Sequence, residues 1–169
     1  MDWLKTAENM KARGFTVRHY ATGAKAAEAL CAELAGQEIG MGGSMTAAQM
    51  KLPEKLEAAG CTVYARGKSW DRGDTDKGVT APVYISSANG VAETGELVNI
   101  DGTGNRVSAT LYGPEKVYFI VGLNKLAPTL EGAIWRARNI AAPLNAKRLG
   151  RKTPCAAAEE PRCFDCRSP

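Results

Sequence analysis

The sequence predicts an α/β fold in which strands and helices alternate around a parallel or mixed sheet. Short apolar or β-branched runs, typical of buried strands, recur along the chain, and stretches with helical apolar spacing separate several of them. Glycine-rich junctions follow three of the predicted strands. Strands that alternate with helices in this way indicate a layered α/β sheet.

Apolar residues three and four positions apart indicate the helices. In the first helix, Leu4, Ala7 and Met10 recur at this spacing, and Asp2 is a suitable N-cap. Pro143 either interrupts the last of these helices or begins a further one. The expected helices cover residues 2–13, 22–34, 46–59 and 129–139.

The last predicted strand is continuous and β-branched, as expected of a strand buried on both faces. Residues 66–80, in contrast, are polar and glycine-rich without periodicity, which predicts a long loop. We therefore expect one domain over residues 1–149 and a cysteine-rich tail over residues 150–169. The expected strands cover residues 15–17, 38–41, 61–64, 83–85, 96–100 and 117–121.

Composition limits the classes of function. The hydrophobic share of 44% and the charged share of 24% are ordinary for soluble globular proteins, and the net charge of +4 is small. A solvated helix face explains the late basic residues better than phosphate binding does, and no nucleic-acid recognition motif is present, so we expect no nucleic-acid partner. These basic residues are Arg136, Arg138, Lys147, Arg148, Arg151 and Lys152.

No apolar run approaches the ~18 residues of a membrane helix, so we expect no membrane partner. The amino terminus also lacks the charged-then-apolar pattern of a signal peptide. We therefore expect a cytoplasmic protein, in which clustered cysteines bind metal or carry out redox chemistry more often than they form disulfides.

The junctions at residues 42–44, 86–90 and 101–105 all follow predicted strands. In open α/β sheets, ligands bind beyond the carboxyl ends of the strands. We therefore expect these three junctions to cluster at one edge of the sheet and to form a single pocket.

The first junction contains Gly42, Gly43 and Ser44, with Thr46 close behind. Glycines allow backbone N–H groups to approach a ligand, and the two hydroxyls would add donors for a small anion. The alternative is a tight strand-to-helix turn in which Ser44 or Thr46 is the N-cap.

The second junction begins the polar stretch over residues 86–95, which contains Asn89, Glu93 and Thr94. Glu93 is the only carboxylate between the strand that ends at Ile85 and Glu96. It is our candidate catalytic residue, as a base, a nucleophile or a ligand clamp. The alternatives are a helix cap or a solvated side chain.

In the third junction, Gly104 would expose backbone to a ligand while Arg106 binds an anion through two hydrogen bonds. The alternative is a plain turn, with Asn105 capping the following helix. The third glycine of a dinucleotide fingerprint, and its acidic residue ~20 positions further on, are both missing. We therefore expect no nicotinamide cofactor. His19 is the sole histidine, which argues against serine–histidine hydrolysis and histidine-ligated zinc.

Three of the five cysteines lie in the tail, with the spacing C-x7-C-x2-C. Cys155, Cys163 and Cys166 are suited to an iron–sulfur cluster or zinc. Such sites normally need four thiolates, so the fourth ligand would be exogenous, belong to another chain or lie beyond Pro169. The alternative is a disordered end with unused thiols. Cys31 and Cys61 are expected to be small buried hydrophobic residues.

Several segments together resemble the short LUD-domain proteins called lactate utilisation proteins. The likeness runs from about residue 2 to the end of the chain, and family tails carry a further cysteine beyond the Ser-Pro. The segments are residues 42–46, 86–102, 104–107, 113–114, 141–149, 153–155 and 163–169.

This resemblance implies a three-layer sandwich around a mixed, mostly parallel sheet, related to sugar-phosphate isomerases and CoA transferases. It also implies a role in oxidising lactate to pyruvate alongside iron–sulfur partner proteins. CoA transferases of this fold use the glutamate of a Ser-Glu-Asn-Gly motif as nucleophile, whereas this chain has Ala88 at that position. Because alanine offers no nucleophile, we do not expect CoA-transferase activity.

Our leading hypothesis is an accessory or redox subunit of lactate oxidation that binds a small anionic ligand at the glycine-rich edge. A second hypothesis is a stand-alone enzyme that acts on a sugar phosphate or a related anion. A third is a non-catalytic assembly or regulatory module, which includes a homo-oligomer held together through its tail.

Overall fold

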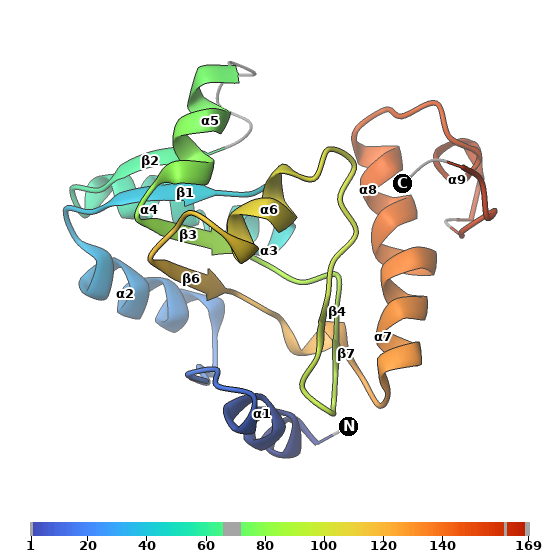
Figure 1. Ribbon diagram of the computed structural model, residues 1–169, viewed down its shortest axis with the longest axis horizontal. Helices are drawn as coiled ribbons and strands as arrows, with labels where there is room; N and C mark the ends of the chain where they lie inside the picture. Colours follow the sequence, from blue (N-terminus) through green and yellow to red (C-terminus); the bar gives the residue numbers. More distant parts are fainter. Residues whose placement is uncertain (1, 66–71, 161, 168–169) are drawn as a thin grey trace. The chain divides into compact units, whose positions relative to one another are not determined.

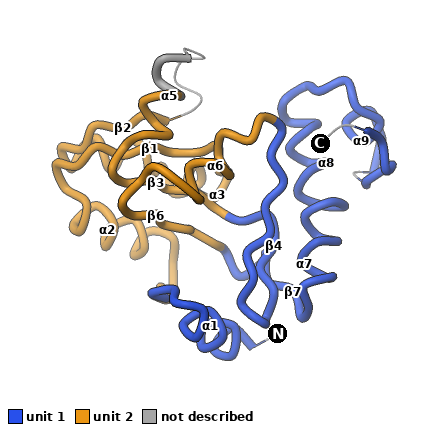
Figure 2. The backbone as a smooth tube through the Cα atoms, in the orientation of Figure 1, with its two compact units in different colours: residues 1–17, 88–102, 122–169 blue, residues 18–87, 103–121 orange. Residues whose placement is uncertain are grey.

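The chain folds into two compact units, which are coloured separately in Figure 2. Each unit has its own β-sheet. Unit 1 comprises residues 1–17, 88–102 and 122–169, and unit 2 comprises residues 18–87 and 103–121. The structure is a computed structural model that describes residues 2–65, 72–160 and 162–167.

Unit 2 contains a four-stranded sheet built from β1 (Glu38–Met41), β2 (Thr62–Ala65), β3 (Val83–Ser86) and β6 (Lys116–Phe119). The strand order is β2-β1-β3-β6, and every neighbouring pair is parallel (Figure 1). Ile39 of β1 therefore lies opposite Val63 on one side and Val83 on the other. This pairing agrees with the parallel or mixed sheet that the alternation of strands and helices predicts, and it confirms the mostly parallel sheet that the family resemblance implies.

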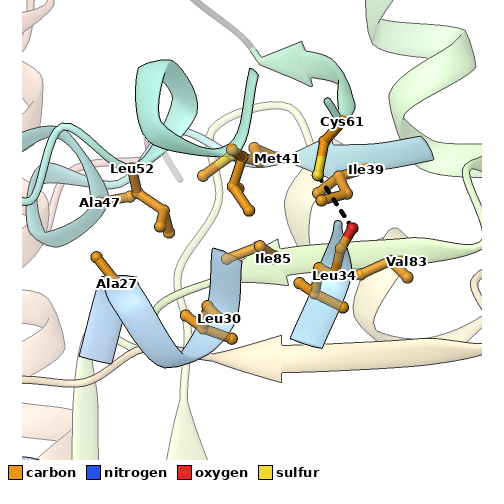
Figure 3. Packing of buried hydrophobic residues seen from close by; sticks show 11 residues of the cluster. Ala27, Leu30, Leu34, Ile39, Met41, Ala47, Leu52, Cys61, Val83 and Ile85 are labelled. Carbon is orange, nitrogen blue, oxygen red and sulfur yellow. Dashed lines mark hydrogen bonds between the residues drawn. The ribbon is translucent and has the colours of Figure 1, made fainter. Parts of the chain in front are cut away.

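One face of this sheet packs on α2 (Gly23–Leu34), α3 (Met45–Gln49) and α4 (Leu52–Ala58). Figure 3 shows Ile39, Met41, Val83 and Ile85 of the sheet among apolar side chains of these helices. Leu34 and Leu52 are at most 1% exposed, so truncating either to alanine would cost about 2–5 kcal/mol.

Both cysteines outside the tail belong to this packing. The Cys61 thiol donates to the carbonyl oxygen of Leu34 at 3.0 Å and is buried, as expected (Figure 3). Cys31 is partly buried against the same cluster, and this burial raises the pKa of its thiol.

The other face carries α5 (Arg72–Thr80) and α6 (Asn105–Leu111), which completes a three-layer α/β sandwich. Helix α5 approaches β1 so closely that a Cβ added to Gly40 would lie 1.8 Å from the carbonyl oxygen of Gly78. The loop expected over residues 66–80 is therefore wrong for residues 72–80, and residues 66–71 lie outside the described part. The contact between this helix and β1 is made by backbone atoms at Gly40 and Gly78. The helix sequence therefore lacks the apolar periodicity from which a helix is usually predicted.

Unit 1 contains a small sheet of β4 (Gly90–Ala92), β5 (Leu97–Val98) and β7 (Leu126–Ala127), in the order β5-β4-β7. The β4–β5 pair is antiparallel and the β4–β7 pair is parallel, so the sheets of the protein are mixed overall. The expected strand over residues 96–100 is thus shorter, and β4 lies inside what the sequence indicated to be a polar junction.

A long helical segment follows β7, formed by α7 (Leu130–Arg136), a π-helical turn (Ala137–Ala141) and α8 (Ala142–Arg148). Pro143 lies in the first turn of α8, so it begins a helix rather than only ending one. Because proline has no N–H and its ring crowds the carbonyl four residues earlier, regular α-helical bonding cannot continue through it. The short 3-10 turn Leu123–Lys125 precedes this segment, and α9 (Pro154–Ala157) follows it.

Side-chain caps begin the first two helices, and of these the Asp2 cap was predicted. The Asp2 carboxylate accepts the N–H of Leu4 at 2.9 Å and begins α1 (Trp3–Ala12), and the Thr22 hydroxyl accepts the N–H of Lys25 at 3.3 Å at the start of α2. The expected helix over residues 46–59 divides into α3 and α4, because Lys51 adopts a left-handed φ of 49° between them.

Two further expectations from the sequence concern the strand at residues 15–17 and membrane-spanning helices. The expected strand over residues 15–17 is irregular backbone. None of the helices in the described ranges has both the length and the apolar character needed to cross a membrane.

Candidate functional site: the glycine-rich sheet edge and the cysteine tail

The carboxyl ends of β1 and β3 meet at one edge of the unit 2 sheet. The Gly42 N–H donates to the Ile85 carbonyl at 3.2 Å, so the chain leaving β1 stays attached to β3. Gly42, which begins the first junction, therefore lies next to the end of β3, the strand that precedes the second junction.

Arg106 reaches this edge from the first turn of α6. A Cβ added to Gly42 would lie 2.9 Å from Arg106 Cγ and 2.9 Å from Tyr84 Oη. The stem of Arg106 therefore occupies the space that any larger residue at position 42 would need. The structure thus brings Gly42 and Arg106 together, as the clustering hypothesis requires.

Gly43 and Ser44 continue the same edge. Gly43 is exposed, and no atom lies within 4 Å of the position that its Cβ would take. The Ser44 hydroxyl accepts the Ala47 N–H at 3.1 Å and caps α3, so the capping interpretation holds. As acceptor of that bond, the hydroxyl keeps its own hydrogen for donation. Thr46 lies inside α3 and is partly buried.

The third junction ends in a different cap from the one the sequence predicts. Gly104 is the N-cap of α6, with a φ of 77° that favours glycine, and Asn105 is the first residue of the helix. The Asn105 side chain instead accepts a hydrogen bond from the Thr103 hydroxyl at 2.7 Å. Capping by Asn105, which the plain-turn alternative included, is therefore wrong.

Glu93 lies in unit 1, in the turn between β4 and β5. Its carboxylate forms an ion pair with Lys5 Nζ at 2.7 Å, and the hydrogen bond from Lys5 lowers the pKa of Glu93. The Asn9 side chain also donates to the Glu93 carbonyl at 2.7 Å. A lowered pKa makes this carboxylate a weaker proton acceptor at neutral pH.

Thr94 and Asn89 form hydrogen bonds in and beside the β4–β5 hairpin, which contains Glu93. The Thr94 hydroxyl donates to Glu96, and the Thr94 carbonyl accepts from Arg13 Nε at 2.9 Å. The Asn89 side-chain oxygen accepts the Ile100 N–H at 2.8 Å. Both side chains therefore have partners within unit 1, whereas the glycines, Ser44 and Arg106 of the edge belong to unit 2.

Sequence reasoning missed the role of Arg136 in unit 1. Arg136 donates to the Asn89 carbonyl through Nη1 and to the Asn124 carbonyl through Nε, the latter at 3.0 Å. Burial lowers the pKa of Arg136. The sequence places Arg136 in a solvated run, and no local pattern reveals carbonyl partners so distant along the chain.

The tail forms a thiol-bearing turn at Cys163–Cys166. Cys163 Sγ accepts the Asp165 N–H at 3.4 Å, and Asp165 adopts a left-handed φ of 52°. Cys155 lies elsewhere, with its sulfur 3.2 Å from the Thr153 hydroxyl. All three are free thiols.

These observations test how well the tail suits a metal. Two cysteines on one tight turn suit two thiolate ligands of zinc or iron. In the described ranges, however, no three His, Cys, Asp or Glu side chains are grouped closely enough to hold an ion. The turn thus fits part of a metal site, and Cys155 does not complete it in this conformation.

Comparison with known proteins bears on most of the chain. The family model described as LUD domain matches residues 4–161. Searches of curated proteins and of solved structures found no significant match.

Proposed function

This chain belongs to the LUD-domain family, and from that premise we propose that it is an accessory or redox subunit in the oxidation of lactate to pyruvate. The family match spans nearly the whole chain and supports a role related to lactate utilisation. The proposal adds a ligand site at the sheet edge and a metal site in the tail.

The ligand of the sheet edge is proposed to be a small carboxylate. The observation that carries this is the placement of the Arg106 stem over Gly42, next to the exposed Gly43. A guanidinium group binds a carboxylate through two parallel hydrogen bonds, and lactate and pyruvate are both small carboxylates. Ser44 would add a hydroxyl donor, and Gly42, Thr46, Gly104 and Asn105 would line the same edge.

Within unit 1, Glu93 is retained as a proposed proton acceptor, and Asn89 and Thr94 are retained as proposed ligand contacts. The ion pair with Lys5 keeps the Glu93 carboxylate charged, which suits acceptance of a proton but limits its basicity.

The tail cysteines are proposed to hold an iron–sulfur cluster or zinc. Cys163 and Cys166 would supply two thiolates from one turn, and Cys155 a third after rearrangement. A bound cluster would supply one-electron transfer, and iron–sulfur proteins are the proposed partners.

Calorimetric titration of the purified protein with lactate and with pyruvate tests the ligand site. We expect at least one of them to bind, and Arg106→Met to weaken that binding at least about tenfold, since hydrogen bonds to charged groups are strong. Arg151→Met is the control, because Arg151 is an exposed arginine with no side-chain partner in the described ranges. Absence of binding to the unmodified protein would refute the ligand site.

A further inference from the structure

We propose that the outer face of α8 is a docking surface for anionic phospholipid, through which the protein binds to the surface of a membrane. The inference does not depend on the ligand and metal sites proposed above, because its residues lie outside both. We call this surface the basic face of α8. It comprises Ile140, Leu144, Lys147 and Arg148, together with Arg151 and Lys152 just after the helix.

Positive charge is concentrated in this part of unit 1. No Asp or Glu occurs in the sequence between Glu131 and Glu159. Arg136 and Arg138, which lie in this interval, have partners, since Arg136 donates to backbone carbonyls and Arg138 pairs with a tail carboxylate. The other basic residues of the interval are exposed, and no carboxylate in the described ranges pairs with them. They are Lys147, Arg148, Arg151 and Lys152.

Helical geometry places two of these charges beside exposed apolar side chains. Positions three and four apart lie on one face of a helix, so Leu144, Lys147 and Arg148 point to the same side of α8. This side faces away from the packing within unit 1, since Ala146 on the opposite side is partly buried. Leu144 is 51% exposed, and Ile140, one turn earlier, is 37% exposed. The basic face thus offers charge and apolar surface together.

The end of the helix fixes the two basic residues that follow it. Gly150 has a left-handed φ of 61°, and its N–H donates to the Lys147 carbonyl at 3.1 Å. The next N–H, that of Arg151, donates to the Ala146 carbonyl at 3.0 Å. These two bonds form a Schellman motif, which folds the chain back against the last helical turn. The charges after the helix therefore stay close to those on it, at the end where the helix dipole favours cations.

The chemistry of this face favours lipid over other anionic partners. Nucleic-acid phosphates gain nothing from exposed leucine and isoleucine, and none of the six residues is an aromatic on which a base could stack. A stable protein interface uses about 20–30 residues on each side, far more than this face has. Clusters of Lys and Arg on an amphipathic helix are, in contrast, typical of segments that bind phosphatidylserine. Lipid headgroups move to meet each cation, and the layer below them accepts apolar side chains.

The prediction of no membrane partner rests on the lack of an apolar run long enough to span a bilayer. Peripheral binding requires no such run, because charge and a few apolar side chains at the surface are sufficient. The sequence alone favours a solvated helix face for these basic residues. The structure adds their position beside exposed apolar side chains and the cap that holds Arg151 and Lys152 near the helix end.

Cosedimentation of the full chain with lipid vesicles tests the inference. One set of vesicles contains equal parts of phosphatidylserine and phosphatidylcholine, and the other set contains phosphatidylcholine alone. The variants are Lys147→Gln/Arg148→Gln and Leu144→Ser. The matched control, Lys11→Gln/Lys25→Gln, removes the same charge from exposed lysines of α1 and α2.

We expect the unmodified protein to bind only the phosphatidylserine vesicles, and to bind them less as salt is added, because salt screens exposed charges. Each basic side chain near such a surface strengthens binding roughly fivefold, so Lys147→Gln/Arg148→Gln should bind roughly twentyfold more weakly. Leu144→Ser should weaken binding roughly fivefold, because serine gains little from the apolar layer. The control should bind like the unmodified protein, and all variants should keep its melting temperature, since the substituted side chains are exposed.

Three results would overturn the inference. The first is that the unmodified protein does not sediment with phosphatidylserine vesicles. The second is a loss in the control as large as in Lys147→Gln/Arg148→Gln, because net charge would then explain the binding. The third is unchanged binding by Leu144→Ser together with equal affinity of the unmodified protein for soluble polyglutamate, since the face would then suit acidic polypeptides rather than lipid.

Discussion

Lys5 Nζ lies 2.7 Å from Glu93 Oε1, which ties the first helix to the turn between β4 and β5. Arg13 strengthens the same attachment, because it donates to the Thr94 carbonyl and pairs with Glu96. The residue that sequence reasoning selects as a candidate base therefore also joins α1 to the small sheet.

This ion pair predicts a pH-dependent contribution to stability. The hydrogen bond from Lys5 lowers the pKa of Glu93, and the same bond raises the pKa of Lys5. The stabilisation is present above the usual glutamate pKa of about 4.3, and it is lost as pH falls through the lowered value. At the alkaline end it is lost as pH rises through the raised pKa of Lys5.

We expect Lys5→Met to lower the melting temperature near pH 7 and to have little effect near pH 2. Melting curves of Lys5→Met, Glu93→Gln and the double variant across pH provide the measurement. Equal effects of Lys5→Met at both pH values would contradict the pairing, as would additive losses in the double variant.

Gly42→Ala should disturb the proposed ligand site. The new methyl group would lie 2.9 Å from Arg106 Cγ and from Tyr84 Oη, so the Arg106 stem must move. We expect weaker binding of the carboxylate that the unmodified protein binds, measured by calorimetry. Arg151→Met is the control, since it changes an exposed side chain outside the proposed ligand site. Similar losses in both variants would show that the Arg106 placement is not the cause.

Gly40→Ala should destabilise unit 2 more than Gly42→Ala does. Its methyl group would lie 1.8 Å from a backbone oxygen of α5, and a backbone group yields less readily than a side chain. Overpacking of this kind costs about 1–3 kcal/mol or more. Urea unfolding measures the cost. A loss below that of Gly42→Ala would show that α5 does not lie directly on β1.

Tyr118 should ionise late. Its hydroxyl donates to Glu33 Oε1 at 2.9 Å, and both burial and this contact raise the pKa of Tyr118. In a spectrophotometric pH titration, we expect the transition that Tyr118→Phe removes to lie above the usual tyrosine pKa of about 10, and Glu33→Gln to shift that transition downward. Glu28→Gln is a control on the same helix, because Glu28 is exposed. An unchanged titration in Glu33→Gln would exclude the contact.

Local sequence signals located the elements that depend on local physics. The run at residues 38–41 is a strand as expected, and Asp2 and Thr22 cap their helices, because burial patterns and caps involve residues close along the chain. The strand β4 was missed because glycine and alanine there suit a turn equally well. Its formation depends on pairing with β5 and β7.

The candidate site was likewise only partly visible in the sequence. Strand endings suggested that Gly42 and Arg106 approach each other, and the structure brings them together. No sequence signal connected Lys5 with Glu93 or Arg138 with Asp165, because each partner is an ordinary charged residue in its own segment.

The sequence by itself determined the α/β class, the layered sheet and the positions of the glycine-rich junctions and tail thiols, because periodicity, caps and spacing depend on residues close along the chain. Only the tertiary structure decided which charges meet, where α5 lies and how the thiol turn is held. These contacts join segments that are distant along the chain. The missing Cβ of Gly40 lets α5 approach β1, and the guanidinium group of Arg138 binds Asp165 of the tail.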